Sequence, residues 1–126
     1  MIIFCFDIDD TIVHWNPNRD YANFAPDKEM VRIINGLYDQ GHYIKLFTAR
    51  GMNSVGPDGI KEAIIPPLLE NLQKIGLKYH ELMTHKPVYD MIIDDKAIDP
   101  WAFKELYHRG ELDDMIEDIE SEKQDR

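Results

Sequence analysis

The chain has 126 residues, of which 44% are hydrophobic and 30% are charged. This length fits one compact domain with a real core, and the single cysteine, Cys5, excludes an internal disulfide. The formal net charge of −10 counts against nucleic-acid partners, because nonspecific binding to nucleic acid depends on neutralisation of phosphates by Lys and Arg.

The start of the chain, MIIFCFDIDD, turns acidic at once and lacks the basic region of a signal peptide. No uncharged apolar run approaches the roughly 20 residues that a membrane span requires. We therefore expect a cytoplasmic protein without a membrane partner. A reducing compartment also suits the lone cysteine, and we expect Cys5 to be a small core residue.

The first expected elements are a strand and a helix, separated by a polar and aromatic stretch. Residues 1–6 are wholly apolar, as in a parallel strand that is buried on both faces. Residues 14–25 are too irregular for a long helix. Pro26 and Asp27 then open a helix that Gly41 closes. Its apolar face consists of Met30, Ile33, Ile34 and Leu37.

The middle of the chain predicts a second strand followed by a helical region. Residues 43–47 form the strand, and a glycine-rich loop over residues 51–59 follows it. Pro66 and Pro67 cannot lie deep inside a straight helix, so we expect a break or a new helix start there. Gly76 ends this region, whose apolar stripe consists of Leu68, Leu69, Leu72 and Ile75.

Two more strands are expected over residues 79–83 and 89–93, and an acidic amphipathic helix from Glu111 onward. Strands that alternate with helices predict a three-layer α/β/α, Rossmann-like fold with a mostly parallel central sheet. Residues 1–110 would form the body of this domain. Residues 111–126 would form a C-terminal helix that belongs to the same domain.

Polar residues with catalytic potential follow several of these expected strands. In open α/β sheets the ligand binds beyond the carboxyl ends of the strands, so we expect these residues to converge. Clustered carboxylates repel one another unless a cation is present, and oxygen ligands near a phosphate favour Mg²⁺. The residues are Asp7, Asp9, Asp10, Thr11, Thr48, Arg50, Lys86, Asp94 and Asp95.

The spacing of Asp7 and Asp9 has a chemical meaning of its own. Side chains two residues apart on an extended segment point to the same side, so both carboxylates can reach one phosphate group. One carboxylate can attack phosphorus while the other group, as a carboxylic acid, gives a proton to the leaving oxygen. The spacing therefore predicts phosphate transfer through a covalent intermediate.

Four short motifs contain most of these residues. Their sequences, and their order along the chain, resemble those of the haloacid dehalogenase (HAD) superfamily of phosphohydrolases. They lie within residues 2–95, which is most of the chain. The resemblance implies a HAD-like fold and a magnesium-dependent phosphatase. The matching segments are Asp7-Ile8-Asp9-Asp10-Thr11, Ile44-Lys45-Leu46-Phe47-Thr48, Lys86, and Ile92-Ile93-Asp94-Asp95.

The resemblance also implies a role for each residue near the reacting phosphate. Asp7 is the expected nucleophile and a magnesium ligand, and Asp9 the general acid and base, with its backbone carbonyl on the metal. Thr48 would bind a phosphoryl oxygen, and Lys86 would orient Asp7 and offset phosphate charge. The last motif would supply the remaining metal ligands.

Asp94 is the expected main metal ligand of the last motif, with Asp95 binding directly or through water. Asp95 and Asp99 also fit an alternative spacing of this motif, DxxxD. Ala49 and Arg50 are further candidates for substrate binding. Arg50 would either contact the phosphate or sugar of the substrate or pair with a surface carboxylate.

The gaps between the motifs leave no room for a cap domain, so we expect an open site. The C-terminal segment or a neighbouring subunit of a homo-oligomer could cover it. The motifs look similar to those of small capless phosphatases of capsular polysaccharide biosynthesis, which implies a sugar or polyol phosphate as substrate. The alternatives are a nucleic-acid terminal phosphatase and a noncatalytic phosphate-binding module.

Overall fold

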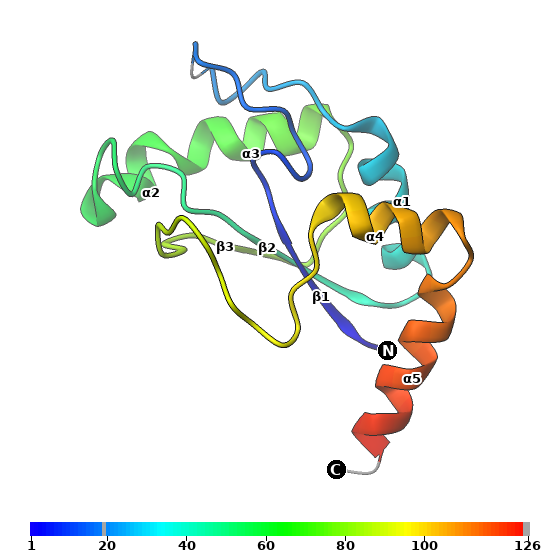
Figure 1. Cartoon of the computed structure of the whole chain (residues 1–126). Helices are drawn as coiled ribbons and strands as arrows, with labels where there is room; N and C mark the ends of the chain where they lie inside the picture. The colour runs from blue at the N-terminus through cyan, green and yellow to red at the C-terminus, as the bar shows by residue number, and fades with distance from the viewer. Residues whose placement is uncertain (19, 125–126) are drawn as a thin grey trace. The chain divides into compact units, whose positions relative to one another are not determined.

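A parallel sheet with strand order β1-β2-β3 organises the first part of the computed structural model, which describes residues 1–18 and 20–124 (Figure 1). The strands are β1 (Ile3–Asp7), β2 (Tyr43–Phe47) and β3 (Glu81–Met83). Asp7 pairs with Phe47, and Phe47 with Met83, so all three strands end at the same edge. The mixed α/β, Rossmann-like fold with a parallel sheet is confirmed.

The chain divides into two compact units, and the sheet lies in the unit of residues 3–89. The connections within this unit contain α1 (Lys28–Asp39), the 3₁₀ turn η1 (Pro57–Gly59), α2 (Ile60–Ala63) and α3 (Ile65–Lys74). Each connection moves one strand further in the same direction. Since such crossovers are right-handed, α1 and α3 cover the same face of the sheet.

The helix α1 forms as the sequence predicts. The Asp27 carboxylate accepts a hydrogen bond from the Met30 N–H at 3.1 Å and so caps its first turn. Gly41 follows the last turn with φ of +93°, the left-handed conformation that glycine adopts without strain. Every residue of the predicted apolar face is buried.

The predicted break between the second and third helices is also confirmed. Ile64 separates α2 from α3, and both Pro66 and Pro67 lie in the first turn of α3. The N–H groups of a first turn have no partner within the helix, so proline costs nothing there. Gly76, which has φ of +71°, ends the helical region, as expected.

The first strand is not buried on both faces. Phe6 is buried, as are Ile44 and Leu46 of β2, but Ile3 is 52% exposed. Cys5 is exposed as well, so its expected place in the core is wrong. The reason is that α1 and α3 cover the same face of the sheet, and within residues 3–89 no described helix covers the other face.

The second unit consists of residues 1–2 and 90–126, and its described part contains two helices. Its helices are α4 (Pro100–His108) and α5 (Leu112–Gln124), and α5 is the predicted C-terminal helix. The prediction missed α4, although Asp99 caps it through the Ala102 N–H at 2.9 Å and Pro100 begins it. An acidic cap followed by proline is an ordinary helix start that the sequence displays.

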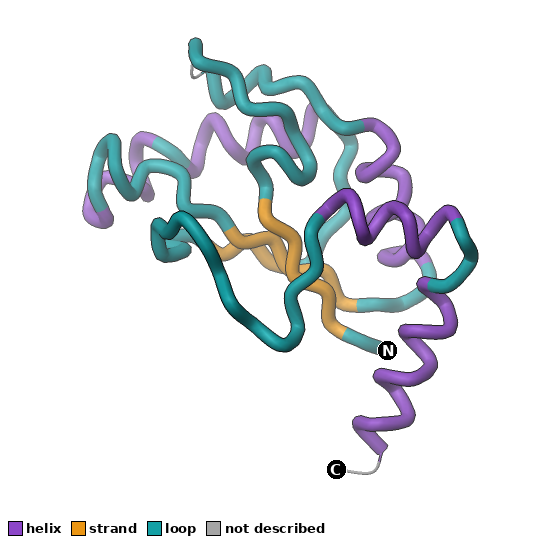
Figure 2. Tube along the Cα trace, in the orientation of Figure 1, coloured by secondary structure: helices purple, strands orange, loops and turns teal. Residues whose placement is uncertain are grey.

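The fourth predicted strand, over residues 89–93, is wrong, because these residues are irregular (Figure 2). Met91 is 77% and Ile93 is 87% exposed. A strand requires a neighbour that pairs with its backbone, and the described structure assigns this segment none. No described helix is long and apolar enough to cross a membrane.

Two glycines allow a matched test of how tightly the loop after β2 is built. Gly51 has φ of +82°, and a Cβ there would lie 2.6 Å from Ile64 Cγ1. A Cβ at Gly36, inside α1, would meet nothing within 4 Å. We expect Gly51→Ala to lower the free energy of unfolding by about 2 kcal/mol and Gly36→Ala to raise it by about 0.5–1 kcal/mol.

Urea unfolding of the two variants and the parent chain measures both changes. Equal changes in the two variants would contradict the tight packing of Gly51 against Ile64.

Candidate active site

A tight turn directly after β1 carries the first motif. The Ile8 carbonyl accepts hydrogen bonds from the N–H groups of Thr11, Ile12 and Val13 at 3.3, 2.9 and 3.2 Å. The Asp10 N–H donates to the Val13 carbonyl at 2.7 Å. These bonds reverse the chain at once, so that Asp7 and Asp9 stay beside the end of the sheet.

Asp10 serves this turn. Its φ of +58° lies in the left-handed region, which aspartate tolerates better than most residues. Its Oδ1 accepts a hydrogen bond from the Trp15 N–H at 3.1 Å. The second of the two adjacent aspartates therefore holds the loop, and Asp9 remains available for chemistry.

A cavity of about 450 Å³ lies at this end of the unit. Asp7 and Asp9 both line it, and so do the predicted residues Ala49 and Arg50. The remaining lining residues are Trp15, Tyr21, Gly51, Asn53, Ser54 and Val88. The structure thus brings the first motif and the residues after β2 to one hollow, as strand ends at a common edge require.

Lys86 approaches the cavity from the loop after β3. Its Nζ lies 3.5 Å from Asp7 Oδ1, and its backbone N–H donates a hydrogen bond to the Thr48 carbonyl at 3.1 Å. Partial burial lowers the pKa of Lys86, but contacts with the Tyr89 hydroxyl and the Asp7 carboxylate outweigh it, so this pKa lies above its ordinary value. The ammonium therefore stays charged at neutral pH.

The carboxyl of Asp7 is partly removed from water. Burial raises the pKa of Asp7 above its ordinary value, and the Lys86 ammonium and the Ile8 N–H oppose that rise. A desolvated carboxylate is more reactive toward an electrophile once it is ionised. Positive charge beside Asp7 is therefore required to keep it ionised when an anion arrives.

Thr48 is 1% exposed, and the structure gives it a local task. Its N–H donates to the Met83 carbonyl at 3.0 Å, and its Oγ1 accepts from the Arg50 N–H at 3.1 Å. These two bonds extend the sheet by one residue and shape the loop that carries Arg50. The predicted contact with a phosphoryl oxygen stays a prediction.

Arg50 pairs with Asp9. Its Nη2 donates to Asp9 Oδ1 at 2.8 Å, and its Nε lies 3.1 and 3.0 Å from Oδ1 and Oδ2. The guanidinium carbon also lies 5.0 Å from the ring centroid of Tyr21 and 4.8 Å from that of Phe24. Of the two expected roles for Arg50, the structure shows pairing with a carboxylate, and that carboxylate is the expected general acid.

Among the aromatic residues of this site, the sequence pointed to Trp15 as a residue that could shape a polar sugar pocket, whereas Tyr21 and Phe24 were not predicted individually. Trp15, Tyr21 and Phe24 form a cluster, with ring centroids 5.3–6.3 Å apart. All three fall in the polar, aromatic stretch of residues 14–25. Aromatic residues in a segment without helical or strand periodicity were the available signal, because such residues need a partner to be buried.

The last motif lies in the other unit. Asp94 Oδ1 accepts from the Lys96 N–H at 2.9 Å, and Asp95 Oδ2 lies 3.3 Å from Lys96 Nζ. The Lys96 ammonium lowers the pKa of the exposed Asp95 carboxyl. Asp99, which together with Asp95 fits the alternative DxxxD spacing, accepts the capping hydrogen bond at the start of α4. Local contacts within residues 90–126 therefore hold each of these three carboxylates.

Oxygen donors for a hard cation are present in the turn after β1. The carboxylate of Asp7 lines the cavity, and the described hydrogen bonds of the turn use the Ile8 and Val13 carbonyls but not that of Asp9. Carboxylate and carbonyl oxygens fit Mg²⁺. Within the described part of the chain, no three His, Cys, Asp or Glu side chains form a metal cluster.

No protein-family model matches the sequence, and no curated protein matches it. A solved structure, a structural-genomics target from Vibrio cholerae, is similar over 82% of this chain and 87% of its own, with 28% identity and a TM-score of 0.76. This likeness covers most of both chains and supports the same α/β fold.

Two further solved chains align with a TM-score of 0.51. One is from the Pnkp1/Rnl/Hen1 complex (20% identity, 84% of this chain and 32% of that one). The other is from the Pnkp1/Rnl/Hen1 RNA repair complex (19% identity, 86% and 30%). They share the fold, and this chain corresponds to about a third of each. Together the neighbours fit the phosphatase-like fold that the motifs predict.

Proposed function

We propose that this chain is a magnesium-dependent phosphomonoester hydrolase of the HAD superfamily that works through an aspartyl-phosphate intermediate on Asp7. One observation carries the proposal. Asp7 and Asp9 line the same cavity, and the Lys86 ammonium lies 3.5 Å from Asp7 Oδ1. A nucleophile, a second carboxyl and a cation beside the nucleophile are the parts that this reaction needs.

The reaction runs in two steps with the same two carboxyls. An oxygen of Asp7 forms a bond to phosphorus while the bond from phosphorus to the leaving oxygen breaks, and Asp9 gives its proton to that oxygen. Water then attacks phosphorus, and Asp9 takes a proton from this water. The bond between phosphorus and Asp7 breaks, which releases phosphate and restores both carboxyls.

Charge balance supports a divalent cation in addition to these residues. Asp7 and Lys86 offset one another, and so do Asp9 and Arg50. A phosphate monoester brings up to two further negative charges. When Asp9 carries the proton that it gives to the leaving oxygen, Arg50 offsets one of these charges, and the other stays without a partner. Mg²⁺, held by Asp7 and the Asp9 carbonyl, would supply the missing charge.

The lining of the cavity supports a small sugar or polyol phosphate as substrate. The Trp15 side chain is 43% exposed, so its ring offers a surface to the apolar face of a sugar. Asn53 and Ser54 line the same cavity and can bond to hydroxyl groups. A few polar groups beside aromatic walls are typical of small-molecule pockets.

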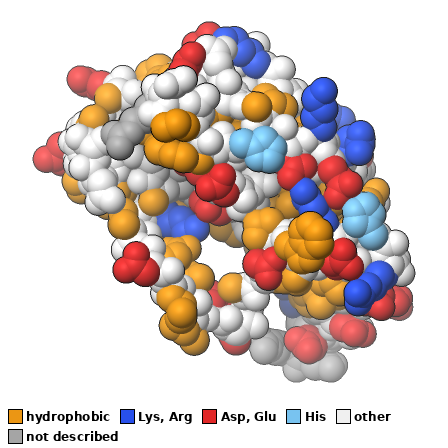
Figure 3. Space-filling model, turned by 45° about the horizontal axis from the view of Figure 1, so that its top comes forward, with side chains coloured by type: hydrophobic (Ala, Val, Ile, Leu, Met, Phe, Trp, Pro, Cys, Tyr) orange, Lys and Arg blue, Asp and Glu red, His pale blue; other side chains and the backbone are white. Residues whose placement is uncertain are grey.

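The overall charge disfavours the alternative of a nucleic-acid terminal phosphatase. The chain carries a formal charge of −10, and Asp and Glu side chains lie among the Lys and Arg side chains on the face that Figure 3 shows. An acidic surface repels a polyanion. A noncatalytic phosphate-binding module is also disfavoured, because binding alone needs no nucleophile with an acid beside it.

Replacement of the nucleophile is the direct test. We expect Asp7→Asn to lower kcat for 4-nitrophenyl phosphate at least about 10³-fold, since an amide does not attack phosphorus. Asp58→Asn, a change of the same kind at an exposed position of η1, should keep full activity. Circular dichroism verifies the fold of both variants. Turnover by a folded Asp7→Asn variant at the parent rate would disprove the assignment.

Removal of the cation tests the charge argument. We expect EDTA to abolish hydrolysis and added Mg²⁺ to restore it, because the two ion pairs do not offset both charges of an incoming phosphate. Beryllium fluoride, which mimics the phosphoryl group, should bind only when Mg²⁺ is present and should not bind to the Asp7→Asn variant. Calorimetry measures this binding independently of turnover. Full activity in EDTA would count against a metal.

Ranking substrates by kcat/KM tests the expected substrate class. Sugar and polyol phosphates should exceed nucleotides and 3′- or 5′-phosphorylated oligonucleotides, because the cavity is small and the chain is acidic. If oligonucleotides ranked first, with a steep dependence of KM on salt, the nucleic-acid alternative would replace the first candidate.

A further inference from the structure

The ion pair of Arg50 and Asp9 is unusual for its burial. The side chain of Arg50 is 1% exposed, and that of Asp9 is 24% exposed, because Asp9 faces the cavity. Arginine presents a rigid, planar fork to a carboxylate, so two or more bonds fix the orientation of the acid as well as its position. A lysine has no such geometry.

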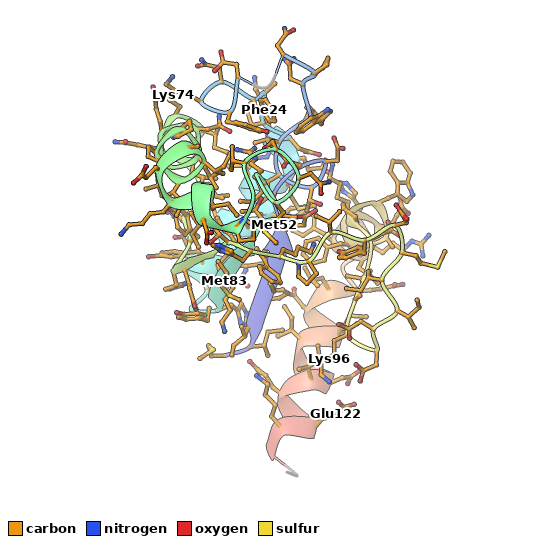
Figure 4. All side chains as sticks on the ribbon, turned by 90° about the vertical axis from the view of Figure 1, so that its left-hand side faces the viewer. Phe24, Met52, Lys74, Met83, Lys96 and Glu122 are labelled. Carbon is orange, nitrogen blue, oxygen red and sulfur yellow. The ribbon has the colours of Figure 1, made fainter. Side chains whose placement is uncertain are left out.

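The guanidinium is itself held in place from the polar, aromatic stretch. The rings of Tyr21 and Phe24 lie 5.0 and 4.8 Å from its central carbon, and arginine interacts favourably with such ring faces. Figure 4 shows Phe24 near Lys74 of α3, in agreement with the hydrogen bond from Lys74 Nζ to Asn23 Oδ1 at 2.9 Å. The aromatic stretch that supports Arg50 is therefore tied to α3.

The third nitrogen of the guanidinium, Nη1, also lies inside the fold. Nη1 is buried and has no hydrogen-bond partner within the described structure. Ring faces are weak acceptors that partly compensate a buried donor. Arg50 thus uses its two other nitrogens on Asp9 and leaves no exposed group with which to reach a substrate.

The two oxygens of Asp9 are held differently. Oδ1 accepts from Nη2 at 2.8 Å and from Nε at 3.1 Å, whereas among residues 1–18 and 20–124 the hydrogen bond to Oδ2 comes from Nε, at 3.0 Å. A carboxylate oxygen can accept two hydrogen bonds. Oδ2 therefore keeps more of its capacity for a proton or a water molecule.

We propose that Arg50 is a positioning residue that acts through Asp9: it anchors Oδ1 and turns Oδ2 toward the cavity as the oxygen that exchanges the proton. This inference rests on the proposed phosphatase function and revises the expected role of Arg50 as a substrate-binding residue. It makes the aromatic stretch part of the proton-transfer machinery, through the rings that fix the guanidinium.

The dependence of the rate on the leaving group distinguishes this role. An alkyl phosphate needs a proton on its leaving oxygen, whereas 2,4-dinitrophenyl phosphate does not, and acid catalysis contributes about 10²–10⁴-fold. We expect Arg50→Lys to lower kcat/KM about 100-fold for an alkyl phosphate such as glycerol 1-phosphate and less than about threefold for the dinitrophenyl ester. Arg32→Lys, at an exposed position of α1, is the matched control and should change neither.

A double-variant cycle separates action through Asp9 from direct contact with the substrate. In an Asp9→Asn background, Arg50→Lys should have almost no further effect on the dinitrophenyl ester or the alkyl phosphate. If it lowers kcat/KM by the same factor as in the parent chain, Arg50 contacts the substrate itself and the proposal is overturned.

A second variant covers the case in which Arg50→Lys does not fold. Tyr21→Leu keeps Arg50 and Asp9 but removes one ring from the guanidinium. It should lower the alkyl-to-dinitrophenyl ratio of kcat/KM in the same direction, about fivefold. An unchanged ratio in a folded variant would reject the proposal while the phosphatase function stands. A parent chain that hydrolyses neither ester would remove both.

Discussion

Parallel pairing of β1 with β2 sets the position of the candidate site, and burial of apolar side chains sets the register of that pairing. Phe6 pairs with Leu46, and both are buried on the face that α1 and α3 cover. Because side chains alternate along a strand, a slip of β1 by one residue would move Phe6 to the exposed face and turn Asp7 toward the helices. The place of the proposed nucleophile is therefore fixed by hydrophobic contacts that take no part in chemistry.

The two ion pairs of the site differ in a way that suits their proposed tasks. Lys86 Nζ lies 3.5 Å from Asp7 Oδ1. The side chain of Lys86 is 15% exposed and that of Asp7 is 40% exposed. A flexible ammonium can shift toward an incoming phosphate and still offset its charge. Arg50 instead holds Asp9 through three contacts from a buried position. A nucleophile must exchange one partner for another during the reaction, whereas a proton donor has to keep its orientation.

The sequence allowed much of residues 3–89 to be predicted, because local signals and tertiary packing agree there. Proline at helix starts, glycine at helix ends and buried apolar runs marked α1, β2 and α3 close to their observed bounds. The errors at Cys5 and residues 89–93 have a common cause. An apolar run predicts burial, but the sequence does not say which face a helix covers or which strand finds a neighbour. The pair of Arg50 and Asp9 was not predictable, since the two residues are 41 positions apart and no periodicity links them.

The orientation of the Asp9 carboxyl depends on a series of contacts that begins in the hydrophobic core. The buried Asn71 of α3 donates from Nδ2 to the Phe24 carbonyl at 3.1 Å, which anchors the aromatic stretch to a helix. Phe24 in turn packs on the guanidinium of Arg50, which holds Asp9. A side chain on a loop is placed accurately only when a rigid element supports it. Because Asn71, Phe24 and Arg50 are all buried, the series ties the acid to the core rather than to the exposed tips of the loops. The polar, aromatic stretch thus contributes geometry to the site as well as a wall to the cavity.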